Sequence, residues 1–148
     1  MIHVRHKAVA VVPVDLAFAH IDDYRNVPDW MFGITRFDPI GDLDQGLGAQ
    51  YDAAMQIGPK TMKSTVEVTE WEQDRIITLS SVAGFGNRSS WMFAPLGGDR
   101  TELSVDFGYE LPGGLAGRAL GKLIEPFVVT AIRQTEANLR KQIEALGL

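Results

Sequence analysis

The fold is decided by one stretch near the end of the chain, residues 115–146, which reads LAGRALGKLIEPFVVTAIRQTEANLRKQIEAL. Its apolar residues recur every three or four positions, which predicts a helix of roughly thirty residues with one face meant for burial. A rise of about 1.5 Å per residue gives a length of about 45 Å, more than the core of a small domain needs. Because strand-like segments precede it and polar residues interrupt its apolar stripe, the stretch predicts a lid over a cavity in a β-sheet.

The two faces of this predicted helix differ in chemistry. The face expected to be buried carries Leu120, Ile124, Phe127, Val128, Ala131, Thr135, Leu139, Gln142 and Leu146. The face expected to meet solvent carries Arg118, Lys122, Glu125, Arg133, Glu136 and Arg140. Pro126 lies inside the helix and cannot donate a backbone hydrogen bond to Lys122, so a kink is expected there.

The segments before this helix predict about seven strands and two short helices. The strands are expected at Val4–Val12, Ile34–Ile40, Gly48–Ile57, Lys60–Trp71, Arg75–Val82, Arg88–Pro95 and Thr101–Leu111. The helices are expected at Val14–Ile21 and at Asn26–Met31, with Asn26 as the cap and Pro28 in the first turn. Short turns at residues 72–74 and 96–100 indicate hairpins, so the sheet is expected to be antiparallel. The register of the strand with Val66 and Val68 stays open, because Trp71 has the opposite parity.

Composition narrows the classes of protein. The chain of 148 residues has no cysteine, which excludes disulfides and thiol nucleophiles and is typical of a reducing compartment such as the cytoplasm. Fourteen Lys and Arg against nineteen Asp and Glu give a net charge of −5, which argues against nucleic acid as a partner. No signal peptide and no apolar run of roughly 20 residues is evident, so no stable membrane insertion is expected. The length favours one domain over residues 1–148.

Four segments resemble one superfamily. They are Val12–Phe18 (VPVDLAF), Asp22–Trp30 (DDYRNVPDW), Val66–Ile76 and Leu111–Leu115 (LPGGL). Together they resemble the SRPBCC (START-like, Bet v 1-like) superfamily over nearly the whole chain, nearest its polyketide cyclase/dehydrase-like branch. The resemblance implies an α+β helix-grip fold, in which a seven-stranded curved antiparallel sheet and two short helices surround a long C-terminal helix.

The resemblance also implies a class of function. The superfamily includes lipid and hormone binders, aromatase/cyclases and coenzyme Q-binding proteins. The expectation is therefore a small hydrophobic or amphipathic ligand, lipid-like or polyketide-like, held between the sheet and the C-terminal helix. No cofactor is expected, and a homodimer stays open.

Alternation along the predicted strands and the helix stripe together select the candidate ligand-binding residues. These are Tyr51, Met55, Leu79, Trp91, Phe93, Val105, Phe107, Tyr109, Ile124, Phe127, Ala131 and Thr135. The resemblance adds Trp30, because its region forms part of the entrance in a helix-grip fold. The same side chains would equally fill a solid core, which is the commoner role of such residues. The hydroxyls of Tyr51 and Tyr109 would each need a hydrogen-bond partner, from a ligand or from the protein.

Two other functions remain open. A cyclase or dehydratase would use Tyr, Arg or His for proton transfer, but Arg88 is expected to point outward and His3, His6 and His20 have no predicted partner. These scattered histidines have no metal-ligand spacing, so no metal site is predicted. Alternatively, the cavity is vestigial and the segment Trp30–Phe32 forms an apolar patch for another protein.

Overall fold

The computed structural model describes residues 2–57, 59–110 and 114–146. The elements follow in the order β1 (Ile2–Ala10), α1 (Val14–Asp22), a short 3₁₀ helix η1 (Tyr24–Asn26), α2 (Val27–Trp30), β2 (Ile34–Ile40), β3 (Gln50–Ile57), β4 (Lys60–Glu72), β5 (Ile76–Gly84), β6 (Asn87–Gly97), β7 (Arg100–Tyr109) and α3 (Gly114–Leu146). This order confirms the predicted helix-grip fold.

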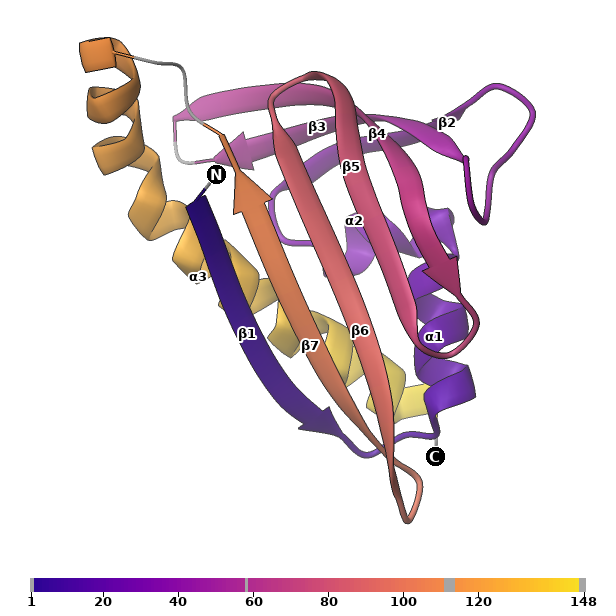
Figure 1. Ribbon diagram of the computed structural model, residues 1–148. Helices are drawn as coiled ribbons and strands as arrows, with labels where there is room; N and C mark the ends of the chain where they lie inside the picture. Colours follow the sequence, from indigo (N-terminus) through magenta and orange to yellow (C-terminus); the bar gives the residue numbers. More distant parts are fainter. Residues whose placement is uncertain (1, 58, 111–113, 147–148) are drawn as a thin grey trace.

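All seven strands join one antiparallel sheet in the order β1-β7-β6-β5-β4-β3-β2. The first strand of the chain therefore pairs with the last, and the remaining neighbours are consecutive in sequence. Figure 1 shows a strongly curved sheet with the three α-helices on one side of it, and α3 runs along the inner face. The curvature matters for function because a flat sheet would leave no hollow between its strands and α3.

A β-bulge settles the register of β4. Val68 faces Leu79 on β5, whereas the next pair is Glu70 with Thr78, so Thr69 is an extra residue on β4. The extra residue reverses the parity of every side chain that follows it. As a result Val68 and Trp71 both reach the inner side, where the Trp71 ring meets Phe18 of α1 edge-on at 5.6 Å.

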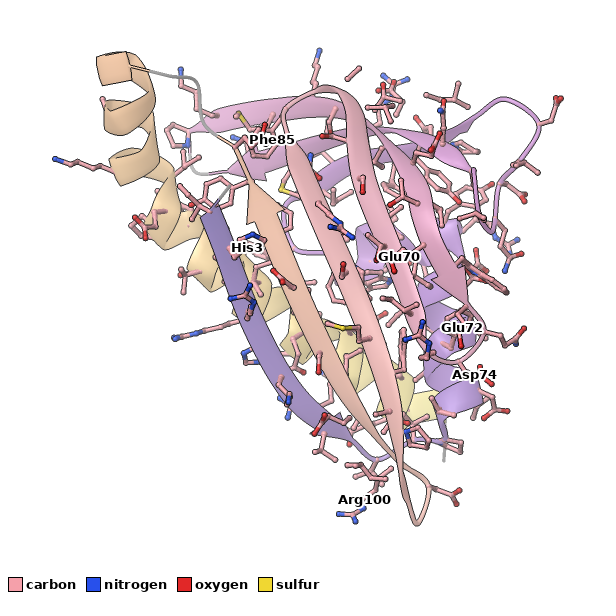
Figure 2. The ribbon with its side chains drawn as sticks, viewed as in Figure 1. His3, Glu70, Glu72, Asp74, Phe85 and Arg100 are labelled. Carbon is pink, nitrogen blue, oxygen red and sulfur yellow. The ribbon has the colours of Figure 1, made fainter. Side chains whose placement is uncertain are left out.

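The alternation predicted for β7 is present. Leu103, Val105 and Phe107 are buried, while the intervening side chains face outward. Polar pairs cover the outer face, and Figure 2 shows His3 and Glu70 there, on the side away from the helices. One face of the sheet is thus available for a core and for a cavity.

The short helices form where they were expected, but one cap differs. Pro28 lies in the first turn of α2 as predicted, whereas the Asn26 side chain makes no capping bond. Its Nδ2 instead donates to the backbone oxygen of His20, at 3.2 Å. Asn26 therefore occupies the predicted cap position, but its side chain turns back to the preceding helix and does not cap α2.

The buried face of α3 is rotated slightly from the predicted one. It consists of Ile124, Val128, Ile132, Thr135, Glu136, Leu139 and Ile143, all nearly inaccessible to solvent. Glu136 was expected in solvent but is only 3% exposed, because its carboxylate pairs with His6 on β1 at 2.9 Å and with Arg140 at 3.1 Å. Leu146 and Phe127, both expected to be buried, are instead about half exposed. The side chains of Leu120 and Arg118 lie outside the described residues.

None of the described helices is long and apolar enough to cross a lipid bilayer.

Candidate ligand cavity

A cavity of about 190 Å³ lies between the inner face of the sheet and α3. The lining side chains come from α3, from strands β2 to β7, from the segment that joins α2 to β2 and from the turn between β5 and β6. They are Met31, Phe32, Ile34, Phe37, Ala53, Met55, Gln56, Ser64, Val66, Leu79, Phe85, Asn87, Ser89, Trp91, Phe107, Phe127, Val128, Thr130, Ala131, Ile132 and Thr135. Residues that lie more than a hundred positions apart, such as Met31 and Thr135, thus meet around one cavity.

The lining is mostly apolar and carries no titratable side chain among the described residues. Six of its residues are polar but neutral, namely Gln56, Ser64, Asn87, Ser89, Thr130 and Thr135. Apolar walls with a few hydrogen-bonding groups are typical of sites for small organic ligands.

The mouth of the cavity lies between α3 and the segment after α2. Phe32 and Phe127 both line the cavity and are 50% and 47% exposed, and Thr130 and Gln56 are exposed as well. The hydroxyl of Thr135 on α3 accepts a hydrogen bond from the backbone N–H of Phe32, at 2.9 Å. This bond fixes one side of the opening against α3.

Seven of the residues selected from the sequence line this cavity. They are Met55, Leu79, Trp91, Phe107, Phe127, Ala131 and Thr135. The strand parity and the helix stripe therefore pointed to the same hollow from both sides.

Trp30 and Tyr51 lie in a smaller hollow of about 30 Å³ that shares Leu79 and Trp91 with the main cavity. The Tyr51 hydroxyl donates to the backbone oxygen of Asp44, at 2.7 Å, so the protein itself supplies its partner. Burial, together with the negative charges of Asp22 and Asp44, raises the pKa of Tyr51 to about 12. This phenol remains protonated at neutral pH and is poorly suited to act as a general base.

Four other selected residues lie in the core rather than on the cavity wall: Phe93, Val105, Tyr109 and Ile124. Their inward direction was predicted, but other side chains cover them. The Phe93 ring, for example, meets Phe18 of α1 edge-on at 5.4 Å. Tyr109 is completely buried, burial raises its pKa with a further contribution from the charge of Glu125, and its hydroxyl has no hydrogen-bond partner among the described residues.

The sequence analysis missed the polar part of the lining. Ser64 and Ser89 share the inward parity of Val66 and Trp91, so the alternation could have found them. Asn87 begins β6, directly after the turn that carries Phe85, which Figure 2 shows near the end of the β5–β6 hairpin. These residues were overlooked because serine and asparagine are not expected on a buried face.

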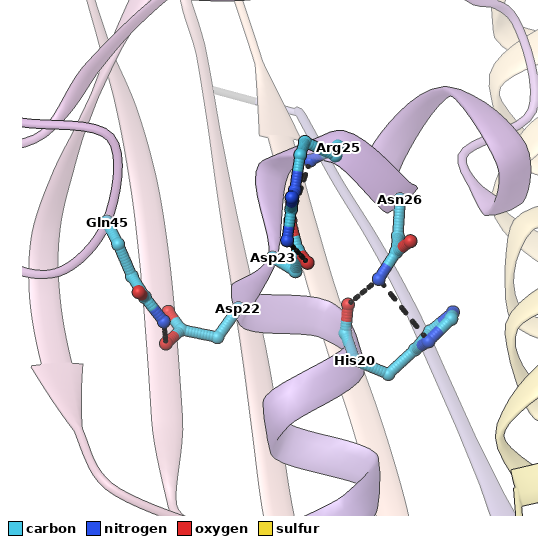
Figure 3. Close-up of polar contacts among 6 residues, drawn as sticks. All are labelled: His20, Asp22, Asp23, Arg25, Asn26 and Gln45. Carbon is cyan, nitrogen blue, oxygen red and sulfur yellow. Dashed lines mark hydrogen bonds and ion pairs between the residues drawn. The ribbon is translucent and has the colours of Figure 1, made fainter.

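A polar network joins α1, α2 and α3. Gln142 of α3 donates from Nε2 to the backbone oxygen of Asp29 in α2, at 2.9 Å, and its Oε1 lies 3.0 Å from Nε2 of His20 in α1. Because a carbonyl oxygen only accepts, the Gln142 amide is oriented, and His20 must donate from Nε2. Figure 3 shows Asn26 next to the other ring nitrogen of His20. His20 thus has partners that sequence reasoning did not find, and it does not line the cavity.

No group of three metal-ligating side chains occurs within residues 2–57, 59–110 and 114–146.

Comparison with known proteins identifies a family with the same sequence pattern. A family profile described as "Polyketide cyclase / dehydrase and lipid transport" matches residues 1–144. The search of curated proteins found no match.

Solved structures with the same fold are distant in sequence. A protein from Thermus thermophilus has a TM-score of 0.83 at 17% identity, with 99% of this chain and 100% of that chain covered. A START superfamily protein from Mycobacterium smegmatis has a TM-score of 0.76 at 17% identity, covering 97% and 98% of the two chains. The ZhuI aromatase/cyclase from Streptomyces sp. R1128 has a TM-score of 0.67 at 17% identity, covering 99% and 98%. At these identities the similarity concerns the fold alone.

Proposed function

Since the chain belongs to the polyketide cyclase/dehydrase and lipid transport family, we propose that it binds a small hydrophobic or amphipathic ligand between its sheet and α3. Membership of this family agrees with the SRPBCC resemblance seen in the sequence. The proposed contacts are the seven predicted residues that line the main cavity: Met55, Leu79, Trp91, Phe107, Phe127, Ala131 and Thr135.

One observation carries the proposal: an apolar cavity of about 190 Å³ that opens to solvent at Phe32 and Phe127. An apolar cavity of about 150 Å³ stays dry and binds benzene, so a ligand portion of one or two rings suits this volume. A longer ligand would extend through the mouth. Transfer of such a ligand from water is favourable because apolar surface is removed from water on both partners.

The chemistry of the lining favours binding over catalysis. A cyclase or dehydratase would need groups that take up and release protons, and none of the described lining residues can do so near neutral pH. The aromatase/cyclase with the same fold shares only 17% identity with this chain, which is too low to infer that the two catalyse the same reaction. The volume of the cavity also speaks against the adaptor hypothesis, in which side chains would fill it.

A matched pair of substitutions on α3 tests the proposal. Ala131→Leu adds bulk inside the cavity, whereas Ala137→Leu makes the same change at an exposed position of the same helix. Equilibrium dialysis with naphthalene, followed by chromatography of both compartments, measures the affinity. We expect A131L to bind roughly tenfold more weakly than the unchanged protein and A137L to bind like it.

Absence of naphthalene binding by the unchanged protein would overturn the proposal. Equal affinity of all three proteins would place the bound probe outside the cavity and would overturn it too. Far-ultraviolet circular dichroism of each variant checks that the fold is kept.

A further inference from the structure

Within the proposed binding site, we infer that Asn87 and Ser89 select a neutral ligand that carries a hydroxyl group, an alcohol or a phenol. The inference rests on the proposed function, since it concerns the same cavity. It adds which polar group the ligand carries and where that group is held.

The side-chain amide of Asn87 has a defined orientation in the cavity wall. Its Nδ2 lies 2.8 Å from the backbone oxygen of Phe85 and 3.4 Å from Oγ of Ser64. A backbone oxygen accepts and never donates, so the nitrogen of the amide must face it. The other amide atom, Oδ1, forms no hydrogen bond with any described residue and is left as an acceptor in the cavity wall.

The neighbouring hydroxyls supply donors. Ser64 Oγ accepts from Asn87, so its proton points elsewhere. Ser89 is 5% exposed, lines the cavity two positions along β6 from Asn87, and makes no hydrogen bond through its hydroxyl within the described part of the chain. An unpaired hydroxyl in an apolar wall is costly unless a ligand or water satisfies it.

One ligand group satisfies both kinds of atom. A hydroxyl can donate its proton to Asn87 Oδ1 and accept from the Ser89 or Ser64 hydroxyl. A ketone or ether would leave Oδ1 without a donor. A methyl group would leave both Asn87 Oδ1 and the Ser89 hydroxyl unpaired.

A carboxylate fits this wall poorly. No Lys, Arg or His is among the described lining residues, so a buried negative charge would lose its water without gaining a cation. Asn87 Oδ1, which carries partial negative charge, would repel it further. The cavity therefore favours an alcohol or phenol over an acid of the same shape.

Three naphthalene derivatives of similar size test the inference: 2-naphthol, 2-methylnaphthalene and sodium 2-naphthoate. A purely apolar cavity would prefer 2-methylnaphthalene, because its methyl group gains more than a hydroxyl on leaving water. We expect the opposite order in equilibrium dialysis, with 2-naphthol bound roughly tenfold more tightly than 2-methylnaphthalene and 2-naphthoate bound most weakly.

The substitution Ser89→Ala tests whether the preference for 2-naphthol comes from this part of the cavity wall. Because Ser89 makes no side-chain hydrogen bond within the described protein, its removal should leave the fold intact. The control is Ser104→Ala, the same change on the outer face of β7. We expect S89A to lose roughly fivefold in affinity for 2-naphthol and to bind 2-methylnaphthalene at least as tightly as the unchanged protein, because no serine hydroxyl is then left unpaired there, while S104A changes neither.

The outcomes separate the two proposals. Equal binding of 2-naphthol and 2-methylnaphthalene, or an equal loss of both in S89A, would overturn this inference and leave the proposed function standing. Preferred binding of 2-naphthoate would also overturn it. If neither neutral compound binds the unchanged protein, the proposed function fails and this inference with it.

Discussion

Tyr51 shows how one side chain that sequence patterns assign to a ligand can serve the protein itself. Its ring stacks on Phe37 with the centroids 4.5 Å apart, and its hydroxyl donates to the backbone oxygen of Asp44. The bond ties the loop before β3 to the sheet. A phenol held in this way has little reason to ionise, which gives it a measurable signature.

That signature is a loss of stability in strong base. The folded-state pKa of Tyr51 is about 12, against an ordinary value of 10.0. Below the ordinary value both folded and unfolded chains are protonated there, and the contribution to stability is complete. As the pH rises from 10.0 towards about 12, the unfolded chain loses the proton first, so the free energy of unfolding falls.

Tyr51→Phe removes this dependence. Two pKa units correspond to about 2.7 kcal/mol, so the free energy of unfolding of the unchanged protein should fall by up to about that much more than that of Y51F. Urea unfolding of both proteins at about pH 9 and about pH 11.5 measures the difference. Parallel pH dependence in the two proteins would contradict the raised pKa.

The sequence patterns predicted well which side of the sheet a side chain faces, but they predicted poorly what surrounds it. The inward parity of Phe93 and Val105 was right, yet whether an inward side chain meets a cavity or a helix depends on where α1 and α3 lie. Glu136 marks the same limit. A carboxylate at that position of the helix is expected to face solvent. In the structure its Oε1 lies 2.9 Å from Nε2 of His6, which is 130 residues earlier in the chain.

At the scale of elements, Gln142 links three helices. It bonds to the backbone of α2 and to His20 of α1, whereas Gln134, two turns earlier on α3, bonds only to Asn138 of its own helix. Gln142 therefore holds α2, and with it the segment that carries the cavity mouth, against α3.

Gln142→Ala should cost about 1 kcal/mol of unfolding free energy, because two hydrogen bonds are lost and one of them leaves the half-buried His20 without its partner. Gln134→Ala, the matched control, should change it by less than about 0.5 kcal/mol, since it loses only an exposed pair within one helix. Amide hydrogen exchange should also rise in α2 for Q142A alone. Equal effects of the two variants would show that the link between helices contributes nothing.

Element boundaries were largely predictable. Hydrophobic alternation and turn residues placed each strand within about two residues of its observed ends, and β2 at its observed ends. The bulge at Thr69 was not predictable, because an extra residue leaves no mark in composition and only reverses the parity that the prediction relies on. This reversal is why the register of β4 stayed open in the sequence.

At the scale of the whole molecule, a ligand that binds only the folded chain should raise its melting temperature. At a hundredfold excess over the dissociation constant the gain is about 2.7 kcal/mol, or roughly 5 to 10 °C for a chain of this size. Differential scanning calorimetry with 2-naphthol measures it, and A131L should show a smaller rise at the same concentration. An unchanged melting temperature of the unchanged protein would contradict binding to the folded state.

The pairing of β1 with β7 has a consequence for how the chain folds during its synthesis. His3 reaches its partner Asp106 across 103 positions of the chain, so a ribosome must make β7 before β1 can join the sheet. The helix that closes the cavity is synthesised later still, from residue 114 onward. During synthesis β1 therefore stays unpaired until β7 has been made. Contacts between strands so far apart in the sequence form slowly. The proposed ligand would meet a complete cavity only after α3 has been synthesised.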